Sequence, residues 1–164
     1  MRTGGFIFFS VLAMLSLLAL GIVNAKEKVT IGAIEEVILL PWGVRLPARI
    51  DTGASTTSLD ARGLKIQNNI AEFRLPDMYG GLLLSLPVVD WRHIRSALTR
   101  HLRPVVEIEL CLGPRRLLIK ANLHDRSQVK YPLIIGRNAL KQGFIVDVRK
   151  TNLFPPSCAE GPSQ

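Results

Sequence analysis

The sequence predicts one mostly β domain, and two observations carry this prediction. From residue 29 onward, short runs rich in β-branched residues alternate with Pro and Gly, and few segments are long or periodic enough for a helix. The chain has 164 residues, 48% of them hydrophobic and 21% charged, which is enough for one core but hardly for two.

Two β-hairpins are expected within this domain. The first joins residues 29–40 to residues 44–50 through a Pro-Trp-Gly turn. The second joins residues 105–112, where apolar and acidic residues alternate, to residues 116–123 through a Gly-Pro turn. These four runs supply most of the predicted sheet.

The remaining elements are short. Residues 133–135 resemble a buried strand, residues 138–142 suit one or two helical turns, and residues 144–148 form a last strand. Residues 66–103 give no clear pattern. Residues 155–164 contain Pro, Ser and Gly with little to bury, so we expect a flexible tail.

The first 25 residues have the pattern of a secretory signal peptide. A basic start is followed by an apolar run from Phe6 to Ile22, and the small residues 23–25 fit a signal-peptidase site. The alternative is an uncleaved membrane anchor, because the run approaches the roughly 20 residues needed to cross a bilayer. The pattern predicts secretion across the inner membrane, a periplasmic location and a folded domain over residues 26–154.

The chain is basic and contains two cysteines. Its net charge is +8, and removal of residues 1–25 takes away only Arg2, leaving +7. Such a charge favours association with an anionic membrane surface, although most of it serves solvation. Export and the scarcity of aromatic residues (6%) argue against a nucleic-acid partner. Export permits a disulfide between Cys111 and Cys158, and a buried thiol at Cys111 is the alternative.

Asp51 is the candidate catalytic residue. It follows the apolar strand 44–50, whose end holds its backbone stiffly. Thr52 can turn its hydroxyl inward to neighbouring backbone, Gly53 lets that backbone approach closely, and Ala54 continues the loop. This order of residues presents an acid in a cleft. The alternative interpretation is an Asx-type turn between two strands.

A second segment, residues 133–140, again has an apolar strand followed by a glycine and a helical start. Together with the Asp-Thr-Gly-Ala loop it resembles the retropepsins, the proteases of retroviruses. More closely, the chain is similar to the bacterial retropepsin-like aspartic peptidases formerly labelled ATP-dependent zinc proteases. The segments IDTGASTTSLDA, RPVVEIEL, NLHDRS and YPLIIGR carry this resemblance, which spans residues 31–148.

The resemblance implies a closed β-barrel of the retropepsin-like, acid-protease type with one short C-terminal helix. In such a fold Asp51 is catalytic, and Thr52, Gly53 and Ala54 form its supporting loop. The structural support is then Ile135, Gly136 and Arg137. Viral retropepsins place an acid where this chain has Ser55, so the partner of Arg137 stays open between Asp60, Asp125 and a differently built dimer contact.

The implied activity is that of an aspartic endopeptidase, and it requires two chains. Its mechanism uses two carboxyl groups that share one proton, whereas this chain has a single Asp-Thr-Gly. A homodimer in which each subunit contributes Asp51 to hydrolyse a peptide substrate supplies the second carboxyl group. The alternative function is a non-catalytic periplasmic peptide-binding or adaptor module on the same fold.

Two further expectations concern the flap and cofactors. Tyr79-Gly80-Gly81 is a candidate for the flap that covers the substrate in retropepsins, with an ordinary surface loop as the alternative. The three histidines and two cysteines lack metal-ligand spacing and no phosphate-binding loop is present, so neither a metal nor another cofactor is expected.

Overall fold

The computed structural model describes residues 27–95 and 100–158, so the predicted signal segment lies outside the described residues. The elements, in chain order, are β1 (Val29–Gly32), β2 (Ile34–Leu40), β3 (Val44–Ile50), β4 (Thr57–Asp60), β5 (Arg62–Gln67), β6 (Ile70–Arg74), the 3-10 helix η2 (Asp77–Tyr79), β7 (Leu83–Arg95), β8 (Arg100–Leu112), β9 (Arg115–His124), β10 (Leu133–Ile135), α2 (Arg137–Leu140) and β11 (Phe144–Asp147). Across these two ranges, no helix is long and apolar enough to cross a membrane.

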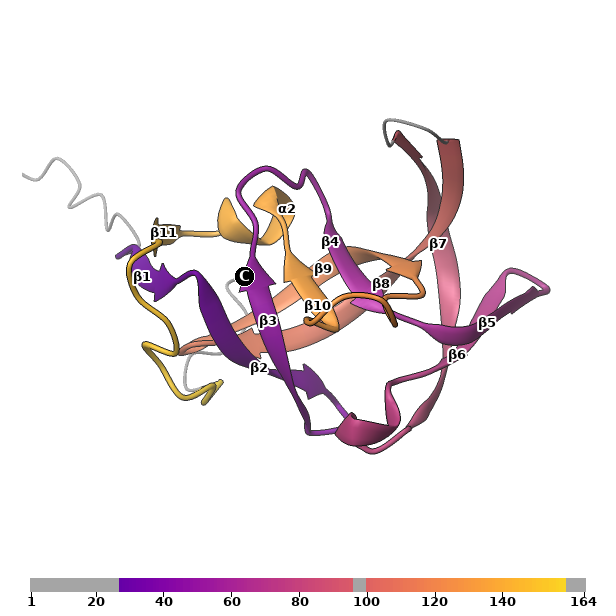
Figure 1. Ribbon diagram of the computed structural model, residues 1–164, viewed down its shortest axis with the longest axis horizontal. Coiled ribbons are helices and arrows are strands. Elements are labelled where there is room, and N and C mark those ends of the chain that lie inside the picture. The colour runs from indigo at the N-terminus through magenta and orange to yellow at the C-terminus, as the bar shows by residue number, and fades with distance from the viewer. Residues whose placement is uncertain (1–26, 96–99, 159–164) are drawn as a thin grey trace, which may run out of the picture.

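Six strands close into a barrel. They follow the order β2-β3-β10-β4-β9-β8, and β8 pairs back onto β2 (Figure 1). One face of each strand fills the interior, as in β9, where buried and exposed residues alternate. The core includes Val37, Leu39, Leu46, Leu59, Ile108, Leu110, Leu123 and Leu133. The prediction of a mostly β closed barrel with one short α-helix is therefore confirmed.

The two predicted hairpins are confirmed. Strands β2 and β3 are antiparallel, and so are β8 and β9. Each turn contains a glycine in the left-handed region, Gly43 with φ 71° and Gly113 with φ 56°, where a side chain would be strained. The expected single strand over residues 29–40 divides at Ala33, because β1 pairs in parallel with β11 while β2 pairs with β3.

The middle of the chain forms an extension of the barrel. Strands β7 and β8 are 13 residues each and continue past the barrel as a long hairpin. Strand β6 pairs with the earlier part of β7, and β5 pairs with β6 (Figure 1). Asn68 and Asn69 form the tight β5–β6 turn with φ of 49° and 62°. Four of the six β5 residues are exposed, so the alternation that identifies a half-buried strand is weak there.

Cys111 and Cys158 form a disulfide, which decides between the two alternatives left open by the sequence. Cys111 lies on β8 and is 1% exposed. The bond ties residues 155–158, the first part of the predicted tail, to the barrel, and Ser157 N also donates to Gly113 O (3.1 Å). Residues 159–164 lie outside the described residues.

Candidate active site

Asp51 stands at the end of β3, where three parts of the chain meet. Strand β10 runs parallel to β3 with Ile135 opposite Ile50, and Asp51 N donates to Ile135 O (3.0 Å). Ile50 and Ile135 are both buried in the core. The backbone that enters the loop is thus fixed by core packing on both strands.

The carboxylate of Asp51 is oriented by its own loop. Its Oδ1 accepts hydrogen bonds from Gly53 N (2.9 Å) and Ala54 N (3.1 Å). Asp51 is half-buried, whereas Thr52 and Gly53 are exposed. A Cβ atom on Gly53 would lie 3.2 Å from Asp51 Oδ1, so a glycine leaves this close N–H contact unobstructed.

Arg137 ties the loop to α2, but through carbonyl groups rather than a carboxylate. Its Nη1 donates to Thr52 O (2.9 Å) and Gly53 O (2.7 Å), and its backbone N donates to Ala54 O (2.9 Å). The expected pairing of Arg137 with Asp60 or Asp125 is wrong. Turn carbonyls need donors, and Arg137 lies within reach of two of them.

Asp60 and Asp125 pair with Arg62 instead of Arg137. Arg62 Nη2 lies 2.8 Å from Asp60 Oδ2, and Arg62 Nε lies 3.7 Å from Asp125 Oδ1. Asp60 is 1% exposed and also accepts from Arg126 N (2.8 Å). This carboxylate therefore holds the segment after β9 in place.

The hydroxyl that turns into the protein belongs to Thr57, not to Thr52. Thr57 Oγ1 donates to Asn138 Oδ1 (3.0 Å) and accepts from Gly136 N (3.2 Å), while Thr57 N donates to the same Asn138 oxygen (2.8 Å). Sequence reasoning missed Thr57 and Asn138. The run of four hydroxyl residues at 55–58 was the available signal, but it does not say which member faces inward.

Gly136 is a position of close approach. A Cβ atom there would lie 2.6 Å from the carbonyl carbon of Thr56 and 2.8 Å from its oxygen. Only glycine fits without displacing the loop end. The structure therefore brings all the sequence-predicted site residues, 51–54 and 135–137, into one assembly.

A cleft of about 520 Å³ lies beside this assembly. The loop residues 53–56 form one side, and the β7–β8 hairpin contributes His93 and Arg103. The remaining lining residues are Ser58, Asn122, Arg126 and Ile134. None of these lining residues is acidic, and Asp51 itself adjoins the cleft through Gly53 and Ala54, which follow it in the loop.

The expected flap at Tyr79-Gly80-Gly81 is wrong. This segment forms η2 and the turn after it, where Gly80 N donates to Asp77 O (2.9 Å). It lies near the β2–β3 turn, at the end of β3 remote from Asp51 (Figure 1). The long β7–β8 hairpin takes the place beside the loop that the sequence assigned to residues 79–81.

The cleft is cationic. Arg103 Nη1 donates to Asn122 Oδ1 (3.3 Å), while its buried Nε has no hydrogen-bond partner within the described ranges, and the same holds for Ser58 Oγ. Arg126 Nε donates to Tyr131 O (3.0 Å). Burial lowers the pKa of both Arg103 and Arg126, and nearby Asp60 and Asp51 oppose this effect on the pKa of Arg126. Both guanidinium groups stay charged at neutral pH.

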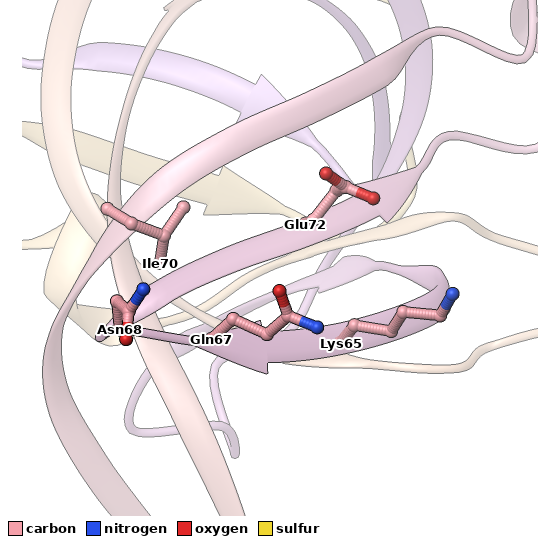
Figure 2. Close-up of a pocket in the computed structure, with 5 residues that line it drawn as sticks. All are labelled: Lys65, Gln67, Asn68, Ile70 and Glu72. Atoms are coloured by element: carbon pink, nitrogen blue, oxygen red, sulfur yellow. The ribbon is translucent and has the colours of Figure 1, made fainter.

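A second hollow lies on the β5–β6 hairpin, away from Asp51. Figure 2 shows a hollow on the β5–β6 hairpin with Lys65, Gln67 and Glu72 along it, and this hairpin projects away from the Asp51 loop (Figure 1). In the described part of the chain, no group of three or more His, Cys, Asp or Glu residues is placed to hold a metal ion.

The closed barrel, with an aspartate loop held against a strand, a glycine and a helix, defines a retropepsin-like fold. A family model described as the retropepsin-like aspartic endopeptidase RimB matches residues 77–156. This match includes the Gly136–Arg137 segment and begins after Asp51.

A crystal structure of a Legionella pneumophila protein of unknown function is similar to this chain. The TM-score is 0.67 with 29% sequence identity, and the alignment covers 76% of this chain and 97% of that one. No curated protein matches the chain.

Proposed function

We propose that this protein is an aspartic endopeptidase whose active site forms between two copies of the chain. The observation that carries this proposal is the setting of Asp51. Its Oδ1 is held by two backbone N–H groups, and the loop residues that follow it line a cleft of about 520 Å³. These two contacts are those of an Asx-type turn, so it is the position of the loop beside the cleft, rather than the turn itself, that supports catalysis.

The chemistry follows from the two oxygens of Asp51. Because Gly53 N and Ala54 N bind Oδ1, Oδ2 is left to face a reacting group. In a pair of such carboxyl groups, the ionised member takes a proton from water as the water attacks the peptide carbonyl carbon. The protonated member donates to the carbonyl oxygen, and when the tetrahedral intermediate collapses the C–N bond breaks as the first group gives its proton to the leaving nitrogen. Like charges at short distance raise the pKa of one group, which keeps the shared proton in place.

The second carboxyl group would come from Asp51 of another copy. The residues that line the cleft of one chain include no acid, and a two-fold axis beside the exposed residues Thr52 and Gly53 would bring two loops together. The mechanism requires such a homodimer because one carboxyl group cannot act as base and acid at once.

The substrate would be an extended peptide with an acidic side chain near the cleaved bond. Arg103 and Arg126 place two cations in the cleft, and the buried Arg103 Nε and Ser58 Oγ have no partner among the described residues. A substrate carboxylate would pair with the guanidinium groups of Arg103 and Arg126, because charge-assisted hydrogen bonds are stronger than neutral ones.

Export remains part of the proposal. The apolar run from Phe6 to Ile22 and the small residues after it support a signal segment, and the disulfide between Cys111 and Cys158 suits an oxidising compartment such as the periplasm. The basic mature chain would also favour contact with an anionic membrane surface.

The decisive experiment digests a peptide library with wild type, Asp51→Asn and the control Asp77→Asn, and measures native mass on the same samples. Asp77 lies on η2 at the other end of the barrel. We expect wild type and Asp77→Asn to cleave as dimers, and Asp51→Asn to remain a folded dimer without activity. Cleavage by Asp51→Asn, or full activity of a strict monomer, would refute the proposal.

A mixed dimer separates the two functions further. Titrating excess inactive Asp51→Asn subunits into wild type should abolish cleavage, because each mixed dimer holds only one competent carboxyl group. If wild type binds peptides without cleaving them, and Asp51→Asn binds them equally well, the alternative of a peptide-binding module is correct.

A further inference from the structure

Residues 148–158, which follow β11, are here called the C-terminal strap, and they lie beside the start of β2. Ala33 N donates to Lys150 O (2.7 Å), and Asn152 N donates to Ile34 O (2.7 Å). The strap ends at the disulfide between Cys158 and Cys111 on β8. It is therefore fastened both to the start of β2 and to the barrel wall.

A buried acid holds the middle of the strap. Glu35 lies on the core-facing side of β2, is 1% exposed, and accepts from Gly32 N (2.6 Å) and Leu153 N (3.2 Å) at the same oxygen, Oε1. Its Oε2 is buried without a hydrogen-bond partner among the described residues. Burying a carboxyl group so incompletely paired costs stability, and an apolar residue would cost less there. The presence of Glu35 therefore indicates a role other than stabilising the barrel.

The strap is one residue away from the strand that carries Asp51. Ala33, which donates to Lys150 O, accepts at its own carbonyl from Ile50 N (3.0 Å). Ile50 is the last residue of β3 and directly precedes Asp51. Gly32 permits this crossing, because a Cβ atom there would lie 2.4 Å from Lys150 O.

We propose that Glu35 is a positioning residue for Asp51, and that it acts by clamping the disulfide-anchored strap onto Ala33 beneath the end of β3. This inference rests on the proposed peptidase function. Reacting groups must be held within a fraction of an ångström, and an error of about 1 Å can cost roughly 100-fold in rate. A clamp at Ile50 limits how far Asp51 can move. The clamp itself does not contact the cleft walls that would bind substrate.

The test compares Glu35→Met, Glu35→Gln and the matched control Glu36→Gln. Glu36 is next on the same strand but points outward and pairs with Arg45 (3.0 Å). Glu35→Met should lower kcat roughly tenfold or more while KM stays within about twofold, because the strand end moves and the cleft does not. Glu35→Gln keeps the accepting oxygen and should restore most of kcat, and Glu36→Gln should match wild type.

Amide hydrogen exchange gives a readout that needs no activity. We expect the amide of Ile50 to exchange faster in Glu35→Met, and also in Cys158→Ser, while the amide of Leu110 in the barrel wall keeps its wild-type protection. Cys158→Ser covers the case in which Glu35→Met fails to fold.

The positioning role of Glu35 and the proposed peptidase function can be refuted separately. If the Ile50 amide is unaffected in both folded variants, or if Glu35→Met lowers stability without lowering kcat, the positioning role is refuted. If wild type cleaves no peptide, the peptidase proposal and with it the catalytic role of Glu35 fail, whereas faster exchange at Ile50 would still show that the strap holds this strand.

Discussion

Arg137 Nη1 donates a 2.7 Å hydrogen bond to the carbonyl oxygen of Gly53, so the first residue of α2 holds the loop that carries Asp51. The same nitrogen also reaches Thr52 O at 2.9 Å. A cation bound to two turn carbonyls fixes the loop without bringing a second carboxylate near Asp51. The helix and the loop are 84 residues apart in sequence, and this contact makes them one unit.

Removing this contact should impair both activity and stability. Arg137→Met loses both side-chain hydrogen bonds, so we expect kcat to fall about tenfold or more and the free energy of unfolding to fall by about 1–3 kcal/mol. Urea unfolding and peptide cleavage measure the two effects. The control is Arg149→Met, whose guanidinium is exposed and pairs with Asp147. Equal effects of the two variants would contradict the assignment.

Gly136 should tolerate no side chain. Its φ of −92° suits any residue, so Gly136→Ala tests steric crowding against Thr56 alone. Overpacking of this kind costs about 1–3 kcal/mol, and the loop should shift with a loss of cleavage. Lys141→Ala, an exposed change just after α2, serves as the control for thermal unfolding. Unchanged stability in Gly136→Ala would mean that the loop end moves freely.

Arg103 should set the preference for acidic substrates. Arg103→Met removes a half-buried cation from the cleft, and a hydrogen bond to a charged group is worth about 1.5–3 kcal/mol. We therefore expect kcat/KM for a peptide with glutamate near the cleaved bond to fall roughly 10- to 100-fold relative to its glutamine analogue. Arg92→Met is the control, because Arg92 is exposed on the same hairpin and lies by Asp90. A uniform loss on both peptides would contradict this role.

The disulfide should contribute strongly to stability. Cys111 and Cys158 are 47 residues apart, and closing a loop of this length restricts the unfolded chain by about 4 kcal/mol. Cys158→Ser should therefore lower the free energy of unfolding by about 2–4 kcal/mol, and a reducing agent should reproduce this loss in wild type only. A reductant that destabilises Cys158→Ser as well would show that another effect is involved.

His124 should make the free energy of unfolding decrease as the pH is lowered. Burial lowers the pKa of His124 below its ordinary value of 6.5, and the charges of Arg103 and Arg126 lower it further. Above pH 6.5 the imidazole is neutral in both folded and unfolded chains, so its contribution to stability is fully present. Below pH 6.5 the unfolded chain binds the proton first, and stability falls until the pH passes the folded pKa.

Urea midpoints measured from pH 7.5 to pH 5 test this linkage. His124→Asn should show a flatter dependence over this window than wild type. Three carboxylates, Glu109, Asp125 and Asp147, have lowered pKa values caused mainly by hydrogen bonds to Arg116, Ser127 and Arg149 respectively. Their effect appears only at lower pH, near their ordinary pKa of about 4. An unchanged slope in His124→Asn would exclude His124 as the cause.

The sequence alone determined the barrel strands near the site and the loop that carries Asp51. Alternation and turn glycines are local signals, so the hairpins around Gly43 and Gly113 were predictable from a few neighbouring residues. The same locality explains the failures. Strand β5 leaves the barrel and is mostly exposed, and the run of hydroxyl residues at 55–58 does not reveal that Thr57 points inward.

Only the tertiary structure decided which distant groups meet. Arg137 reaches carbonyls of the Asp51 loop across 84 residues, and Glu35 receives the strap across 118 residues. Arg103 enters the cleft from the β7–β8 hairpin, also far along the chain from that loop. Such contacts depend on how the barrel closes and on which backbone groups are left without donors. Propensity and periodicity extend over a few residues, whereas the closure that brings these groups together involves the whole barrel.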